Sequence, residues 1–213
     1  MSDWTLEQIA TAMQGAVEGA PRQNLEVTGF SIDSRTVKPG EVFVAIKGEN
    51  HDGHRFIPDV LQKEVSAVVA SASATLPVDR NGVPVVRVGD CLNALQKLAG
   101  WHRKRHPGLF LGITGSNGKT TTKEMLAHLF SRVSSLWATA GNLNNHIGLP
   151  LNLVRIPLSC QTAIMEMGMN HAGEIRFLAE LARPTSGIIT GIGPAHIGNL
   201  GSLENIALAK AEM

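Results

Sequence analysis

The stretch with the clearest chemical meaning is a glycine-rich segment that ends in Gly-Lys-Thr. It runs from Gly112 to Thr121, follows an apolar run and opens a segment with helical apolar spacing. Small residues let backbone N–H groups surround phosphate oxygens, while Lys119 could reach the β- and γ-phosphates and Thr120 could bind Mg²⁺. A turn that only joins a strand to a helix would not need Gly-Lys-Thr at that point. The segment therefore predicts a nucleotide-binding loop made of Gly115, Ser116, Asn117, Gly118, Lys119, Thr120 and Thr121.

One feature of this loop departs from the usual GxxxxGK[ST] pattern. That spacing requires glycine at position 113, where the chain has Ile113, and its glycine is Gly115. We expect a variant phosphate loop.

Polar residues elsewhere in the second half could complete such a site. Glu166 lies in an apolar run at the expected end of a strand, where a carboxylate is costly unless it binds a metal or forms an ion pair. His196 follows another strand and is either a ligand or an ordinary loop histidine. Lys210, taken alone, is a lysine on a solvated helix face. The asparagines of the next candidate group are turn residues or site residues: Asn142, Asn144 and Asn145.

The first half has two polar segments of its own. Arg35, in Asp33-Ser34-Arg35, suits bidentate contact with phosphate, but the segment could equally be a surface turn with an internal ion pair. Asp52 and His54 allow the same two interpretations.

Strand and helix patterns alternate around these residues, which predicts an α/β protein. Short β-branched runs predict strands at 27–33, 42–46, 65–70 and 83–88, with helices at 5–13, 55–63 and 90–105. His106-Pro107-Gly108 then marks a boundary between two domains. After it we expect strands at 109–114, 136–139, 162–167 and 186–192, each but the last followed by a helix, and a final helix from Ser202. The alternation predicts a mostly parallel sheet with helices on both faces.

Composition excludes several classes of protein. The 19 Lys and Arg nearly balance the 18 Asp and Glu, so no global field holds nucleic acid or an anionic membrane. The basic run 101–106 sits at a helix end, where we interpret it as a solvated face. The 2 cysteines form no CxxC pattern, and no apolar run is long enough to span a bilayer. A reducing, cytoplasmic setting is expected.

The loop 114–121 resembles the variant phosphate loop of the Mur ligases and of their relatives, folylpolyglutamate synthetase and cyanophycin synthetase. Further segments favour the Mur ligases, and within them the member that adds D-Ala-D-Ala to UDP-MurNAc-tripeptide. These segments are Asp33-Ser34-Arg35, 39–46, 52–54, 141–150, 166–169, 195–198 and 209–212.

The resemblance implies an ATP-dependent amide ligase of peptidoglycan precursor synthesis that works through an acyl phosphate. It implies residues 1–106 as a UDP-sugar-peptide-binding domain and 107–213 as the first part of a central ATP-binding domain. The remainder of that domain and a C-terminal domain would be absent, and the chain alone inactive. ATP and Mg²⁺ are the implied cofactors, UDP-MurNAc-peptide and D-Ala-D-Ala the substrates, and a monomer the expected state.

The resemblance also implies roles for individual residues. Catalytic roles fall to Lys119, Glu166, His196 and Lys210, and nucleotide contacts extend to Asn142 and Asn145. Metal ligation falls to Thr120, Glu166, His196 and, if it is carbamylated as in many relatives, Lys210. Substrate binding falls to Ser34, Arg35, Asp52 and His54. Alternatives are the ligase that adds the third amino acid and a non-catalytic nucleotide- or UDP-sugar-binding module.

Overall fold

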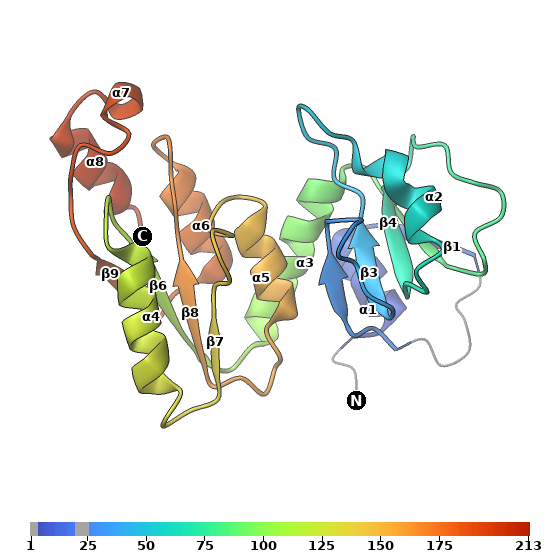
Figure 1. Ribbon diagram of the computed structural model, residues 1–213, viewed down its shortest axis with the longest axis horizontal. Coiled ribbons are helices and arrows are strands. Elements are labelled where there is room, and N and C mark those ends of the chain that lie inside the picture. Colours follow the sequence, from blue (N-terminus) through green and yellow to red (C-terminus); the bar gives the residue numbers. More distant parts are fainter. Residues whose placement is uncertain (1–3, 20–25) are drawn as a thin grey trace. The chain divides into compact units, whose positions relative to one another are not determined.

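The computed structural model describes residues 4–19 and 26–213, which form an α/β protein of two compact units (Figure 1). The first unit extends to Trp101 and the second comprises His102–Met213. None of the helices in the described ranges is long and apolar enough to cross a membrane.

The first unit is built on a five-stranded sheet of order β1-β5-β4-β3-β2. Its elements are α1 (Leu6–Met13), β1 (Ala16–Glu18), β2 (Gly29–Ser31), β3 (Glu41–Val44), a 3₁₀ helix η1 (Gly53–Phe56), α2 (Ile57–Val60), β4 (Ala67–Ser71), β5 (Val85–Val88) and α3 (Cys91–Arg105), which runs on into the second unit. Strands β2 to β5 are parallel, and β1 is antiparallel to β5. The carboxyl ends of β2 to β5 therefore share one edge of the sheet.

Burial in this unit follows the apolar runs of the sequence. Val42, Val68 and Val85 on adjacent strands are each 0% exposed, and α2 packs into the same core through Ile57 and Val60. Helix α1 begins where Thr5 predicts, because Thr5 and Gln8 cap each other's backbone N–H groups. The strands and α1 thus confirm the periodicity argument.

The predicted helix 55–63 is shorter in the structure. Asp52 caps a 3₁₀ turn first, and the α-helix covers only Ile57–Val60, with Pro58 in its first turn. Strand β1, a short exposed edge strand, was not expected from the sequence.

The second unit carries a four-stranded parallel sheet of order β7-β8-β6-β9. Its elements are β6 (Leu109–Thr114), α4 (Lys119–Phe130), β7 (Leu136–Ala138), α5 (Gly148–Arg155), β8 (Thr162–Glu166), α6 (Glu174–Ala182), β9 (Ser186–Ile189), α7 (Ile197–Leu200) and α8 (Leu203–Lys210). Because the chain runs from β6 past β8 to β7 and then returns, right-handed connections place α4 on one face and α5 and α6 on the other, as Figure 1 shows.

This winding creates a switch point between β6 and β8. The connections that leave these two neighbouring strands go to opposite faces of the sheet, and ligands of open α/β sheets bind in the crevice at such a point. The glycine-rich loop follows β6, and Glu166 ends β8. The fold therefore brings the two main candidates from the sequence to one place.

The interpretation of the basic run 101–106 as a solvated face holds for Lys104 and Arg105, which are exposed, but is wrong for three other residues of the run. His102, Arg103 and His106 are buried. Arg103 donates from Nε to the Ala182 carbonyl (2.6 Å) and from Nη2 to the Arg183 carbonyl (2.9 Å), and its guanidinium lies 3.8 Å from the centre of the Phe110 ring. Arg103 thus donates hydrogen bonds to carbonyls at the end of α6, which have no partner within the helix.

Two of the apolar residues whose helical spacing predicts α4 are exposed instead of buried, and β9 is shorter than expected. The apolar side chains Met125 and Leu129 of α4 are 64% and 62% exposed, whereas Lys123 is buried and donates to the Thr139 carbonyl at 2.8 Å. Strand β9 ends at Ile189 instead of Ile192 because the chain turns at Thr190 toward the glycine-rich loop.

Candidate functional site

The glycine-rich loop joins β6 to α4 as the sequence predicts. Gly118 has φ +81° and forms the N-cap of α4, so the helix begins at Lys119 with its amino end facing the loop. The first N–H groups of a helix have no partner within it and carry positive potential, which suits an anion. Lys119 Nζ donates to the Gly115 carbonyl at 2.7 Å and so folds back over the loop.

Glu166 provides a carboxylate that accepts a hydrogen bond from this loop. It is 3% exposed, and its Oε2 accepts from the Thr120 hydroxyl at 3.1 Å while its Oε1 accepts from Asn144 Nδ2 at 2.8 Å. Its backbone N–H donates to the Thr139 hydroxyl at 3.0 Å. No cation pairs with Glu166 among the ion pairs of the described residues, so hydrogen bonds alone hold the buried carboxylate.

The residue types around Glu166 fit Mg²⁺. A hydroxyl and a carboxylate are hard oxygen ligands, and Mg²⁺ in phosphate sites uses one or two carboxylates together with phosphate oxygens and water. Within residues 4–19 and 26–213, no three His, Cys, Asp or Glu side chains form a ready metal cluster. A metal at Thr120 and Glu166 would therefore need oxygens from a bound phosphate.

The three asparagines Asn142, Asn144 and Asn145 make different contacts near Glu166. Only Asn144 reaches the carboxylate, and its carbonyl accepts from the Gly168 N–H at 2.9 Å. Asn145 uses its side-chain oxygen to accept from the N–H groups of Ile147 and Gly148, which starts α5. Asn142 is exposed. Asn144 is thus the member of the segment that the structure places next to Glu166.

Lys210 lies in the last turn of α8 and is 1% exposed. It is therefore not on a solvated helix face, as its sequence position alone suggested. Burial lowers its pKa to about 8, and the nearby charge of Lys119 acts in the same direction. The two lysines are therefore close enough to repel each other. His196 is exposed at φ +66° and forms the N-cap of the short helix α7, in the loop that follows β9.

Two contacts of the site were missed by sequence reasoning. Thr139 accepts the Glu166 N–H, and Thr190 donates to the Asn117 carbonyl at 2.5 Å. Both threonines directly follow a parallel strand, at the edge where ligands bind. That position was the available signal, although it does not show which partner a hydroxyl selects.

The first unit has a second polar group at the carboxyl edge of its sheet. Asp33 follows β2 and forms the internal ion pair that the sequence left open, with Arg35 Nε 2.9 Å from Oδ1 and Nη2 2.7 Å from Oδ2. These contacts with Arg35 lower the pKa of Asp33 to about 2. Lys63 Nζ donates to the carbonyls of Ser34 and Arg35, which fixes the turn while the Arg35 side chain stays 85% exposed.

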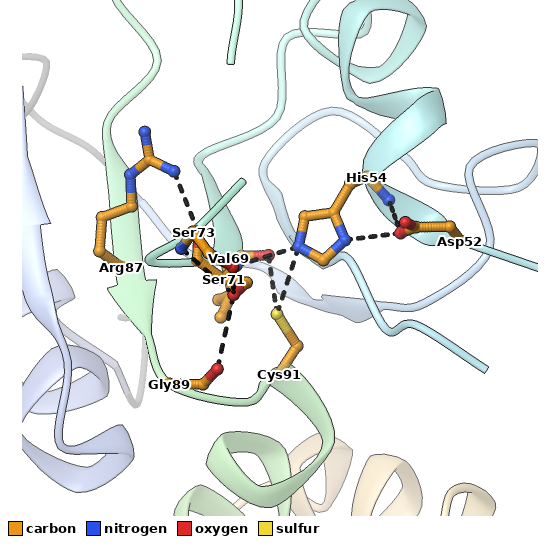
Figure 2. Close-up of polar contacts among 8 residues, drawn as sticks. All are labelled: Asp52, His54, Val69, Ser71, Ser73, Arg87, Gly89 and Cys91. Atoms are coloured by element: carbon orange, nitrogen blue, oxygen red, sulfur yellow. Dashed lines mark hydrogen bonds and ion pairs between the residues drawn. The ribbon is translucent and has the colours of Figure 1, made fainter. Parts of the chain in front are cut away.

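Asp52 and His54 follow β3 and form a bridge to β4 (Figure 2). The Asp52 carboxylate lies 2.7 Å from His54 Nδ1, and His54 Nε2 accepts the Ser71 N–H at 3.0 Å. Because a backbone amide can only donate, the ring proton belongs on Nδ1, facing Asp52. The hydrogen bond from His54 is the main cause of the lowered pKa of Asp52.

The thiol of Cys91 lies beside this bridge. Its Sγ is 3.8 Å from both His54 Nε2 and the Val69 carbonyl, and burial raises its pKa to about 12. A thiol held in its neutral form is a poor nucleophile. The pairing of cysteine with histidine therefore does not form a nucleophilic site.

Comparison with known proteins identifies the class. Residues 113–213 match the Mur ligase middle domain, and residues 26–103 match the Mur ligase family, catalytic domain. The chain belongs to the Mur ligase family. It is 38% identical over 209 residues to the UDP-N-acetylmuramoyl-tripeptide--D-alanyl-D-alanine ligase of Bacillus subtilis (strain 168), covering 98% of this chain and 45% of that protein. It is 36% identical to the ligase of the same name from Escherichia coli (strain K12), covering 98% of this chain and 44% of that protein.

Solved structures agree with these relatives. A crystal structure of MurF from Acinetobacter baumannii matches with a TM-score of 0.87 at 34% identity, over 98% of this chain and 45% of that one. MurF from Thermotoga maritima in complex with ADP matches with a TM-score of 0.75 at 34% identity, over 89% of this chain and 43% of that one. The chain thus spans less than half the length of the relatives it matches.

Proposed function

We propose that this chain is the UDP-sugar-peptide-binding and nucleotide-binding part of an ATP-dependent ligase that adds D-Ala-D-Ala to UDP-MurNAc-tripeptide in the cytoplasm. The contact that carries the proposal is the 3.1 Å hydrogen bond from Thr120, in the phosphate loop, to the buried carboxylate of Glu166. This pair offers the oxygens that a nucleotide-bound Mg²⁺ requires. The names of the similar ligases favour D-Ala-D-Ala over addition of the third amino acid.

The proposed reaction has two steps. A substrate carboxylate oxygen attacks the γ-phosphorus of ATP, the bond to ADP breaks, and an acyl phosphate forms. The amine of D-Ala-D-Ala then attacks the acyl carbon, the carbon–oxygen bond to phosphate breaks, and the amine loses a proton. Mg²⁺ would neutralise charge on the phosphate oxygens during the transfer.

The residues of this chain would mainly bind and orient the nucleotide. The amino end of α4 and Lys119 hold the phosphates, while Thr120 and Glu166 hold the metal. Asn144 fixes the Glu166 carboxylate through its 2.8 Å hydrogen bond. In this proposal Asn142, Asn145 and His196 lie around the same nucleotide, with His196 at a second metal position.

Lys210 would enter as a carbamate. With a pKa of about 8, about a tenth of Lys210 is a free amine at pH 7, and only the free amine combines with CO₂. The product is a carboxylate-like anion that would relieve the repulsion from Lys119 and could bind metal. We expect ¹³C-bicarbonate to produce a carbamate signal in the NMR spectrum that Lys210→Arg abolishes.

In the first unit the proposal assigns the substrate's nucleotide end to the carboxyl edge of the sheet. Ser34 and the exposed Arg35 would contact the diphosphate or uracil, while Asp52 and His54 shape the edge beside them. Arg35 would exchange the Asp33 carboxylate for a phosphate, since a guanidinium binds both in the same bidentate manner.

Calorimetric titration with ATP in the presence of Mg²⁺ tests the nucleotide site. We expect saturable binding that Lys119→Ala weakens at least ~10-fold, because a lysine-to-phosphate contact is charge-assisted. Lys104→Ala, at an exposed position of α3, is the matched control and leaves binding unchanged. Absence of binding in the unaltered chain, or equal loss in both variants, would contradict the proposal.

A further inference from the structure

Thr190, which directly follows β9, places its side chain against the phosphate loop. Its hydroxyl lies 2.5 Å from the Asn117 carbonyl and 3.2 Å from the Thr114 carbonyl, and its backbone N–H donates to the Thr114 carbonyl at 2.9 Å. A hydroxyl has a single hydrogen to donate. The shorter distance assigns that hydrogen mainly to Asn117.

The loop is shaped around this hydroxyl. Gly115 has φ +151°, and a Cβ at that position would overlap the Thr190 hydroxyl. A side chain at 115 would therefore displace Thr190 or open the loop. This contact gives a physical reason why the glycine lies at 115 in this loop.

The contact with Asn117 also fixes the direction of the next N–H group. Every peptide bond in the part of the chain that the structure describes is trans, so the carbonyl of Asn117 and the N–H of Gly118 point in opposite directions. Because the carbonyl is held toward Thr190, the Gly118 N–H faces away from β9. Gly118 is the N-cap of α4, where this N–H joins the partnerless N–H groups of the first helical turn.

Ser116 shows what an N–H of this loop does when it faces the segment that follows β9. Ser116 donates its N–H to the Gly191 carbonyl at 2.9 Å, and its hydroxyl contacts both the N–H and the carbonyl of Gly193 at 3.0 Å. These groups of Ser116 are occupied by the protein. If the Asn117–Gly118 peptide flipped, the Gly118 N–H would face the segment after β9 and would no longer be directed toward a ligand.

We propose that Thr190 is a positioning residue of the nucleotide site: its hydroxyl holds the Asn117–Gly118 peptide so that the Gly118 N–H is directed at a nucleotide phosphate. The inference rests on the proposed nucleotide-binding function and adds a residue from outside the phosphate loop. It also gives the segment after β9, which leads to His196, a direct part in shaping that loop.

Calorimetric titration with Mg-ADP of Thr190→Val and Thr190→Ser tests the inference. Valine keeps the shape but has no hydroxyl, and we expect it to weaken ADP binding ~10-fold or more, the effect of one lost charge-assisted hydrogen bond. Serine restores the hydroxyl and should restore affinity. Equal affinity of the valine variant and the unaltered chain would overturn the inference, whereas failure of the unaltered chain to bind ADP would instead count against the proposed function.

Thr185→Val is the matched structural control. Its hydroxyl also donates to a backbone carbonyl, that of Phe110 in β6 at 2.9 Å, at the opposite end of β9 from the loop. It should lower the free energy of unfolding in the same way as Thr190→Val while leaving ADP affinity unchanged. Equal losses of ADP affinity in the two variants would mean that Thr190 acts only through stability.

A second measurement does not depend on the variants folding. In ¹H–¹⁵N spectra of the unaltered chain, ADP should move the Gly118 amide proton downfield, as a new hydrogen bond to phosphate requires, and leave the Ser116 amide nearly unmoved. A Gly118 amide that stays in place while those of Lys119 and Thr120 move would also overturn the inference.

Discussion

The Thr120 hydroxyl donates a 3.1 Å hydrogen bond to Oε2 of Glu166, across the switch point between β6 and β8. The two residues are 46 positions apart in the chain. Their pairing joins the phosphate loop to a buried carboxylate that has no cation partner in the described part of the chain. Buried carboxylates in proteins are usually paired with a cation, and here a bound metal would supply that positive charge.

Glu166→Gln should remove the dependence of ATP affinity on Mg²⁺. Glutamine has nearly the same shape but no negative charge, so we expect Mg-ATP affinity to fall about 10-fold or more. Affinity for ATP in EDTA should stay the same or rise, because a like charge near the phosphates is gone. Calorimetric titration with and without Mg²⁺ measures both, and Glu180→Gln, at an exposed position of α6, is the control. If Mg²⁺ raises the ATP affinity of the variant as much as that of the unaltered chain, Glu166 does not bind the metal.

Lys210 should make the folding stability depend on alkaline pH. Its folded-state pKa of about 8 lies below the usual 10.5, so the unfolded chain binds more protons between these values. The free energy of unfolding should therefore rise as pH increases from about 8 toward 10.5, and the full cost of the buried cation is present below pH 8. Lys210→Met should remove this rise and be the more stable form at pH 7. Urea unfolding at a series of pH values in carbonate-free buffer measures it, and parallel curves for the two proteins would contradict the buried-cation account.

Arg103→Met should destabilise the second unit by about 2–4 kcal/mol, because buried carbonyls lose a charged donor. Arg103 donates to the carbonyls of Ala182, Arg183 and His106. Lys104→Met changes the neighbouring, exposed position of the same helix and should cost less than about 0.5 kcal/mol. Denaturant unfolding of both variants compares the two; similar losses would mean that the carbonyl contacts contribute little.

Asp33 should titrate far below an ordinary aspartate. Its pKa is about 2 against the usual 3.8, chiefly through the hydrogen bonds from Arg35. The stabilisation from the pair is therefore present above pH 4 and is lost as pH falls toward 2. Because Arg35 is 85% exposed, the loss should stay below about 1 kcal/mol. NMR titration of the carboxyl carbon measures the pKa directly, and Arg35→Ala should return it to near 3.8; an unshifted Asp33 in the unaltered chain would disprove the pairing.

Strands β6 and β8 could be predicted from the sequence because their apolar runs are continuous, as expected for parallel strands buried on both faces. The phosphate loop could be predicted because it depends on local geometry: a strand, glycines and Gly-Lys-Thr at a helix start. Glu166 followed from the cost of a carboxylate inside an apolar run. Each of these signals is contained in a short stretch of chain.

Other features depend on partners distant in the sequence. Thr190 and Asn117 are 73 residues apart, and Arg103 and Ala182 are 79 apart. No local pattern shows which carbonyl a threonine or an arginine will reach, so the basic run was assigned to solvent. The burial of Lys210 depends in the same way on how α8 packs.

Calorimetric titration of this chain with UDP-MurNAc-tripeptide tests the proposed substrate most directly. We expect saturable binding that Arg35→Ala weakens at least ~10-fold, while Arg132→Ala, an exposed arginine of the second unit, leaves it unchanged. Failure to bind UDP-MurNAc-tripeptide by a chain that still binds Mg-ATP would contradict the assignment of the peptidoglycan substrate.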